Sequence, residues 1–224
     1  MLDWDGCLAV SDVLRPGALT VTGAARRFAI VSNNSTATAV ELAAQAGAQG
    51  LMIAPSQIHL AGEAALREAA RRLKTRRVWL VACETMIAAG EAMGLIIDEV
   101  APEAVIVMRD EGFDYAKLTK AVALLGGGAQ FWAANLDHAH PGRCGAVPET
   151  GALAAAIAAA AARRPDLVAG KPYPAIFRQA LAGLGCRPGL ALMVGDNPRT
   201  DLAGARRVGV RALRVDAASW APVA

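Results

Sequence analysis

The chain has 224 residues, a formal net charge of +3, 54% hydrophobic residues and 4% aromatic residues. At about 100–200 residues per domain, this length allows one large or two small domains, and the hydrophobic content excludes an intrinsically disordered chain. The small charge and the scarcity of aromatic side chains argue against a nucleic-acid-binding protein. The alanine-rich run Ala152–Ala162 is shorter than the about 20 residues of a membrane-spanning helix. Acidic residues stand where a signal peptide would be basic, so we expect a cytoplasmic protein with no membrane partner.

The first residues place two carboxylates one position apart, Asp3 and Asp5, directly before Gly6. In an extended segment side chains alternate, so both carboxylates can project to the same side. Their charges repel unless a cation lies between them or one holds a proton, and a glycine turn can offer its backbone N–H to an anion. This arrangement favours a site for Mg²⁺ and a phosphate, although Asp-x-Asp-Gly also occurs in calcium loops and ordinary turns.

Only Met1 and Leu2 precede Asp3, whereas a strand typically has about 5–6 residues. The first strand is therefore predicted to be a stub, with the α-amino group about 7 Å from Asp3. We expect native residues upstream of Met1, and a version extended by them is expected to melt at a higher temperature.

Polar residues follow three further predicted strands. The apolar run Phe28–Val31 ends at Ser32, before a helix predicted over Ala37–Ala46; this layout is typical of an anion site, and simple helix capping is the alternative. Lys171 follows a glycine in a proline-bounded turn that leads into a helix, which lets it aim at a fixed point; a surface lysine is the alternative. Asp196 follows the apolar strand Leu190–Val194, where open α/β sheets bind their ligands.

The middle of the chain alternates strands and helices, which predicts a second parallel sheet. The expected strands are Val78–Ala82, Ala104–Met108 and Gln130–Ala134, with helices over Met86–Met93 and Asp114–Leu125. The loop Asn135–Pro141 that follows is polar. His138 and His140 within it could bind a metal, but contact with a substrate is favoured because loops on a scaffold commonly carry recognition.

Two other stretches carry simpler predictions. Val10–Gly23 is expected to be irregular, with a turn at Pro16-Gly17. Ser56–Leu73 is expected to be helical, with His59 as a core residue rather than a ligand.

The aspartate pair Asp3 and Asp5, then Ser32, Lys171, and Asp196 with Asp201 resemble, in this order and over nearly the whole chain, the four motifs of the haloacid dehalogenase superfamily of phosphohydrolases. The chain is most similar to subclass IIA, the NagD-like group that includes phosphoglycolate, 4-nitrophenyl phosphate and pyridoxal phosphate phosphatases. The segments that carry this closer resemblance are Val31-Ser32-Asn33-Asn34-Ser35-Thr36, Asp114-Tyr115-Ala116-Lys117-Leu118, Asn135-Leu136-Asp137, Gly170-Lys171-Pro172 and Gly195-Asp196-Asn197-Pro198-Arg199-Thr200-Asp201.

The resemblance implies an α/β fold with a Rossmann-like parallel-sheet core and an inserted α/β cap domain. It assigns residues 1–75 and 166–224 to the core and residues 76–165 to the cap. Members of this group often pair through the cap, so a homodimer is an open expectation.

The resemblance also implies a Mg²⁺-dependent phosphatase of small phosphorylated metabolites that works through an aspartyl-phosphate. Asp3 would be the nucleophile and Asp5 the general acid and base, while Ser32 and Lys171 would hold phosphate oxygens. The ion would be held by Asp3, the backbone carbonyl of Asp5 and Asp196. The remaining expected site residues are Gly6 and Asn33 near the phosphate, Asn135, Asp137 and His140 toward the leaving group, and Asp201 and Asn197 bracing the metal ligands.

This chain departs from the family pattern in its truncated lead strand and at three further places. Trp4 is bulkier than the residue usually found between the two aspartates. Met108-Arg109 and Glu149-Thr150 stand where small or apolar residues are expected. These departures affect the prediction of the substrate more than the prediction of the reaction.

Two other functions remain as alternatives. A phosphotransferase or phosphomutase would use the same aspartyl-phosphate. A non-catalytic phospho-ligand-binding regulatory protein would retain the site as a sensor, but Asp5 argues against it because binding alone needs no proton donor. Dehalogenase chemistry is disfavoured because it has no use for that acid.

Overall fold

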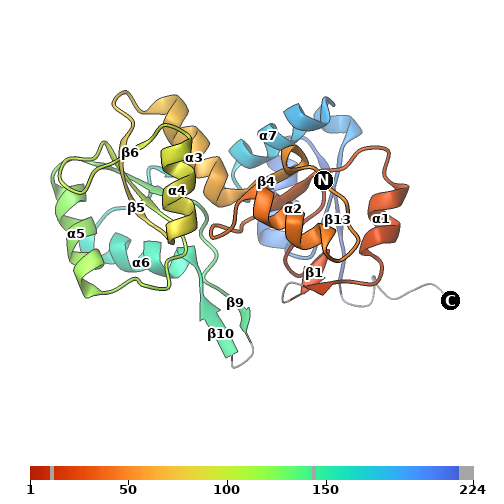
Figure 1. The fold of residues 1–224 in the computed structure, drawn as a ribbon, viewed down its shortest axis with the longest axis horizontal. Coiled ribbons are helices and arrows are strands. Elements are labelled where there is room, and N and C mark those ends of the chain that lie inside the picture. Colours follow the sequence, from red (N-terminus) through yellow and green to blue (C-terminus); the bar gives the residue numbers. More distant parts are fainter. Residues whose placement is uncertain (11–12, 143–144, 217–224) are drawn as a thin grey trace. The chain divides into compact units, whose positions relative to one another are not determined.

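The computed structural model describes residues 1–10, 13–142 and 145–216, and it divides the chain into two compact units. Unit 1 contains Met1–Ser32, Ala39–Leu60 and Lys171–Ala224, and unit 2 contains Asn33–Thr38 and Ala61–Gly170. The chain therefore passes from one unit to the other four times. Both units are mixed α/β structures built on parallel strands (Figure 1).

Unit 1 has a parallel sheet whose centre is the N-terminal segment. Strand β3 (Ile30–Ser32) pairs with β4 (Ile58–Leu60), and β12 (Leu192–Gly195) pairs with β13 (Arg211–Arg214). Leu2 forms parallel bridges to a residue of β3 on one side and of β12 on the other. Its N–H donates to the Ala29 carbonyl at 2.9 Å, and its own carbonyl accepts from Val31 at 2.9 Å. The predicted stub strand is therefore present, and it joins the two strand pairs.

Short helices cover this sheet, and a hydrophobic core that includes Leu2, Trp4 and Leu8 fills the space beneath them. The bulky Trp4 is 1% exposed, so it serves the core rather than the surface. The remaining elements of unit 1 are the hairpin β1 (Ala9–Val10) and β2 (Val13–Leu14), helices α1 (Ala18–Ala24), α2 (Ala39–Gly47), α7 (Pro174–Leu184) and α8 (Ala203–Arg207), and the short helical turns Pro55–Gln57, Pro188–Leu190 and Pro198–Leu202.

Unit 2 has its own five-stranded parallel sheet, as the alternating pattern predicted. The strand order is β11 (Leu167–Val168), β8 (Gln130–Ala133), β7 (Ala104–Val107), β5 (Arg77–Val81) and β6 (Ile96–Ile97). Alternate side chains such as Trp79 and Val105 pack against helices α5 (Tyr115–Gly126) and α6 (Thr150–Ala161). Helices α3 (Ala61–Arg72) and α4 (Glu84–Ala92) pack together near Leu80, which points to the opposite face. The hairpin of β9 (Ala139–Gly142) and β10 (Gly145–Pro148) extends away from the sheet (Figure 1).

The structure corrects two local predictions. Ser56–Leu73 is not one helix, because residues 58–60 form β4 and only Ala61–Arg72 is helical. His59 consequently lies on a strand, where its pairing with Val31 overrides the helical pattern of the following residues. Val10–Gly23 is only partly irregular, since it contains β2 and most of α1.

The division into units also differs from the expected domain boundaries at residues 76 and 165. Helix α3 belongs to unit 2 because it packs against α4, and its second residue, Gly62, donates its N–H to the Asn34 carbonyl at 3.1 Å. None of the helices in the described part of the chain is long and apolar enough to span a bilayer.

Candidate active site

Three predicted site residues of unit 1 lie where parallel strands end, and a fourth lies just before a helix. Asp3 follows the Leu2 bridge, Ser32 is the last residue of β3, and Asp196 follows β12. Lys171 precedes α7, whose first residue is Pro174. Because neighbouring parallel strands end at the same edge of a sheet, the fold brings these side chains together.

The buried centre of the site is an ion-pair cluster around Lys171. Its Nζ lies 2.5 Å from Asp3 Oδ1 and 2.6 Å from Asp201 Oδ1. The side chain of Lys171 is only 3% exposed, and that of Asp201 is fully buried. Burial alone would lower the pKa of Lys171, but the carboxylates of Asp201 and Asp3 more than offset this effect, so its pKa is raised. The lysine is therefore held as a cation at a fixed point and is not a surface residue.

The same cluster carries more negative than positive charge. Ligand atoms of Asp3, Asp196 and Asp201 all lie within 4.8 Å of one another. Burial raises the pKa of Asp3, and burial followed by the charge of Asp201 raises that of Asp196. Carboxylate oxygens gathered in this way suit a hard divalent cation such as Mg²⁺, which would offset the excess charge. Within the described residues this is the one such group of three, and His138 and His140 belong to none.

The turn after the nucleophile position is packed tightly against Asp196. Gly6 has φ +81° and has no space for a side chain, because a Cβ there would overlap the Asp196 carboxylate. Ser32 Oγ donates to Asp5 Oδ2 at 3.1 Å, which ties the exposed Asp5 to the end of β3. The expectation that the Gly6 N–H is open to an anion is wrong, because it donates to the Ala9 carbonyl at 2.9 Å and closes the turn.

Arg15 is a site-supporting residue that the motif pattern did not reveal. Its Nη2 donates to the Gly6 carbonyl at 3.1 Å, and its backbone N–H donates to the Leu8 carbonyl at 2.8 Å. It therefore holds the turn between Asp5 and Cys7 from outside. The only sequence signal was its place before Pro16-Gly17, which marks a turn but not its contact.

Asp201 and Asn197 brace the end of β12. Asp201 Oδ2 accepts the Asn197 N–H at 3.1 Å, and Asn197 Oδ1 accepts the Arg199 N–H at 3.0 Å. The carboxylate of Asp201 also lies over Gly195, where any side chain would overlap it. These contacts orient the loop that carries Asp196.

In unit 2, the loop at Asn135–Asp137 is tied to Asn33, the residue that follows Ser32 in the chain. Asn33 Nδ2 donates to Asp137 Oδ2 at 2.9 Å, and Asn135 Nδ2 donates to the Asn33 carbonyl at 2.6 Å. Asn135 is 1% exposed and its Oδ1 accepts the Asp137 N–H at 3.0 Å. Its amide is therefore occupied by Asn33 on one side and by Asp137 on the other, which differs from the expected direct contact with a substrate.

Comparison with known proteins identifies the family. A family model of haloacid dehalogenase-like hydrolases matches residues 1–96, and a HAD-hydrolase-like model matches residues 168–218. Over 219 residues the chain is 29% identical to dihydroxyacetone phosphatase of Corynebacterium glutamicum, covering 96% of this chain and 79% of the relative. It is 30% identical over 217 residues to the ribonucleotide monophosphatase NagD of Escherichia coli, covering 95% and 85%. The chain belongs to the haloacid dehalogenase superfamily, in its NagD-like group of phosphatases.

A solved structure agrees with this assignment. The fold is similar to that of a glycerol phosphate phosphatase from Mycobacterium tuberculosis in complex with magnesium, with a TM-score of 0.88 and 30% identity over 96% of this chain and 66% of that one. The expected family and α/β fold class are thus confirmed, and so is the assignment as a phosphomonoester hydrolase.

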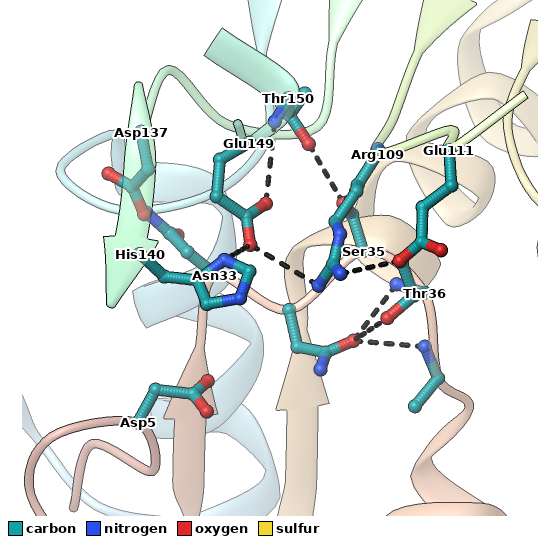
Figure 2. A network of polar contacts seen from close by, with 12 residues as sticks. Asp5, Asn33, Ser35, Thr36, Arg109, Glu111, Asp137, His140, Glu149 and Thr150 are labelled. Carbon is teal, nitrogen blue, oxygen red and sulfur yellow. Dashed lines mark hydrogen bonds and ion pairs between the residues drawn. The ribbon is translucent and has the colours of Figure 1, made fainter. Parts of the chain in front are cut away.

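Two of this NagD-like phosphatase's departures from the family pattern meet in unit 2. Glu149 Oε1 lies 3.6 Å from Arg109 Nη1 and 2.7 Å from His140 Nδ1 (Figure 2). The contact with His140 is close, but Nδ1 makes no hydrogen bond of good geometry with it, and the pair is an ion pair only when His140 is protonated. Arg109 Nη2 also donates to Glu111 Oε1 at 2.6 Å. The sequence showed both departures but not that they are partners.

Proposed function

We propose that this NagD-like phosphatase hydrolyses small phosphorylated metabolites with Mg²⁺ and through an aspartyl-phosphate on Asp3. The observation that carries the proposal is the buried cluster in which Lys171 contacts both Asp3 and Asp201 while Asp196 lies beside them. A cation and several carboxylates converging on one point suit the binding of a phosphate together with a divalent ion. The magnesium complex of the related glycerol phosphate phosphatase supports the choice of ion.

Asp3 is held in one orientation for attack. Its Oδ1 accepts the Trp4 N–H at 2.8 Å and contacts Lys171, so we assign the attack on phosphorus to Oδ2. A bond forms between this oxygen and phosphorus as the ester P–O bond breaks, and Asp5 gives its proton to the leaving alcohol. In the second step Asp5 takes a proton from water, the water oxygen bonds to phosphorus, and the acyl phosphate P–O bond breaks.

The remaining residues stabilise charge and position the reacting groups. Ser32 and Lys171 would bind phosphate oxygens, and Lys171 would offset charge that develops in the transition state. Asp3, the backbone carbonyl of Asp5, and Asp196 would hold Mg²⁺, which supplies positive charge at the phosphate when bound. Asp201 and Asn197 would keep these groups in place.

The loop in unit 2 would contact the leaving group. The support is that Asn33, which follows Ser32 in the chain, donates a hydrogen bond from its side chain to Asp137 at 2.9 Å. We assign the direct contacts to Asp137 and His140, which are partly exposed, and we assign positioning roles to the occupied amides of Asn33 and Asn135.

One assay tests the chemistry. The native chain should hydrolyse 4-nitrophenyl phosphate with Mg²⁺ and lose activity in EDTA, and Asp3→Asn should abolish turnover. Asp5→Asn should trap the phosphoenzyme, because the second step lacks its base. Activity that survives Asp3→Asn would remove the covalent mechanism, and phosphate binding without hydrolysis in the native chain would favour the regulatory alternative. A phosphotransferase would instead transfer the phosphoryl group to an added alcohol and form a new phosphomonoester.

We further propose a cytoplasmic enzyme that pairs through unit 2. The proposal follows from the pairing that is common in the family, and the exposed apolar side chains of Val100, at 86%, and Tyr115, at 82%, are positions on this unit where it can be tested. Light scattering on the native chain and on Val100→Lys with Tyr115→Lys tests the pairing, since a dimer should become a monomer.

A further inference from the structure

The backbone turn that carries Lys171 is held by a segment that lies far from it in the sequence but within the same unit 1. This turn, residues 171–174, leads from Lys171 to Pro174, where α7 begins. Pro172 and Pro174 have no backbone N–H, so the turn can form few backbone hydrogen bonds of its own. The position of the lysine backbone therefore depends on contacts from other segments.

The segment that follows β12 contacts this turn at three places. Asp201 Oδ1 pairs with Lys171 Nζ at 2.6 Å. Three residues later, Gly204 lies so close to the turn that a Cβ there would be 3.0 Å from Pro172 Cα. After three more residues, α8 ends at Arg207, whose side chain also contacts the turn. Since residues at this spacing are neighbours on a helix surface, one helical segment holds both the ammonium group and the backbone of the turn.

Arg207 contacts the turn in two ways. Its guanidinium carbon lies 5.5 Å from the centroid of the Tyr173 ring, which is within the range of a cation–π interaction. Its Nη1 donates to the Pro172 carbonyl at 3.4 Å. The arginine therefore binds the two residues that directly follow Lys171 in the chain.

Tyr173 occupies a position where a different type of side chain is usual. It is the N-cap residue of α7, where Ser, Thr, Asn and Asp are preferred because their side chains accept a backbone N–H. The Tyr173 side chain accepts no such hydrogen bond. Its ring is partly buried and lies against the Arg207 guanidinium instead, so it serves the contact between the turn and α8 rather than the start of α7.

The helix dipole offers a simpler explanation for a cation at the end of α8. Arg206, the preceding residue, is exposed and is equally well placed for that role. Its side chain makes no hydrogen bond, ion pair or ring contact with the residues that the structure describes. The dipole thus accounts for both arginines alike, whereas the contacts with Pro172 and Tyr173 belong to Arg207.

We propose that Arg207 and Tyr173 form a positioning pair, which holds the backbone of Lys171 so that its ammonium group meets the phosphate at a fixed point. The inference rests on the proposed function, in which Lys171 binds phosphate oxygens and offsets charge in the transition state. It goes further by assigning a role in the reaction to two residues outside the four motifs. Because a misplaced catalytic group slows the chemical step, loss of the pair should lower kcat more than it raises KM.

Steady-state hydrolysis of 4-nitrophenyl phosphate with Mg²⁺ tests the pair. Arg207→Gln removes the cation from the ring, so kcat should fall by about fivefold or more while KM changes by less than about twofold. Arg206→Gln is the matched control, because it removes the same charge at the adjacent position, and both parameters should stay within about twofold. Arg207→Lys keeps a cation for the ring and should recover part of kcat.

A double-mutant cycle tests whether the two residues act together. Tyr173→Leu removes the ring and should lower kcat by a similar factor, and its combination with Arg207→Gln should lower kcat little further. Thermal melts of each variant give the folded fraction, to which kcat is referred. Tyr173→Leu is also compared with Arg206→Gln by itself, so a single variant that fails to fold does not remove the test.

The results distinguish this inference from the proposed function. If the native chain hydrolyses the compound but Arg207→Gln behaves like Arg206→Gln, changes KM alone or gives losses that add to those of Tyr173→Leu, the positioning pair is overturned and the phosphatase stands. If the native chain shows no hydrolysis with Mg²⁺, the proposed function fails and the positioning role fails with it. A loss of kcat that is shared by Arg207→Gln and Tyr173→Leu, is not additive and is absent from Arg206→Gln supports the inference.

Discussion

Asn33 donates its side-chain N–H to Asp137 at 2.9 Å, although 104 positions separate the two residues in the chain. Asn33 directly follows Ser32, the proposed phosphate ligand, and Asp137 lies on the loop proposed to contact the leaving group. This hydrogen bond therefore links the segment that contains Ser32 to the loop that contains Asp137.

Asn33→Asp should place a carboxylate against Asp137 and displace the loop, since two like charges at this separation repel. We expect kcat/KM for glycerol 3-phosphate to fall by about tenfold or more. The double variant Asn33→Asp with Asp137→Asn restores a donor and an acceptor with the direction reversed, so steady-state kinetics should show partial recovery. A double variant that is no better than the single one would mean that this contact is unimportant.

Gly170→Ala should destabilise unit 2, because a Cβ at this position would meet Asn33 Oδ1, the Ala134 carbonyl and Ala61 Cβ, all closer than 3 Å. Overpacking of this kind costs about 1–3 kcal/mol, which urea unfolding can measure. Gly126→Ala is the matched control, since nothing lies within 4 Å of its Cβ position at the end of α5. The control should be neutral or slightly stabilising, and equal losses in both variants would contradict the explanation.

Arg15→Met should lower kcat, since it removes the donor to the Gly6 carbonyl and loosens the turn that carries Asp5. A hydrogen bond worth about 1 kcal/mol corresponds to a loss of about fivefold. KM for 4-nitrophenyl phosphate should change little, and Arg15→Lys should recover part of kcat. Arg26→Met, at an exposed position of the same unit, is the control. A change in KM alone would show that Arg15 binds substrate rather than positions the turn.

Asp98 should make the stability of unit 2 depend on acid pH. Hydrogen bonds from the Val100 N–H and from Arg77 Nε, the latter at 2.6 Å, lower the pKa of Asp98 to about 2. A carboxyl group whose pKa is lower in the folded than in the unfolded chain stabilises the fold above its unfolded pKa of about 3.9, and this effect is lost as the pH falls through the folded pKa.

Asp98→Asn should therefore melt at a lower temperature than the native chain at neutral pH. The difference in melting temperature should shrink between about pH 4 and pH 2.5, where the native carboxyl group takes up its proton. Thermal melts followed by circular dichroism across this range provide the measurement. A difference that stays constant with pH would show that shape, and not charge, explains the loss.

Local sequence patterns determined much of this protein. The positions of Asp3, Ser32 and Asp196 at the ends of strands indicated one site, because residues that end neighbouring parallel strands converge even when the strands are far apart in the sequence. The alternation of strands and helices between Val78 and Ala134 predicted a separate sheet for the same reason, since apolar periodicity is a property of each segment alone.

Only the tertiary structure decided how these segments pair. Gly6 uses its N–H within its own turn, His59 lies on a strand, and the amide of Asn135 is occupied by Asn33 and Asp137. Arg109 and Glu149 are partners across 40 positions of sequence. Contacts of this kind depend on which segments become neighbours after folding, and no local period or spacing encodes that choice.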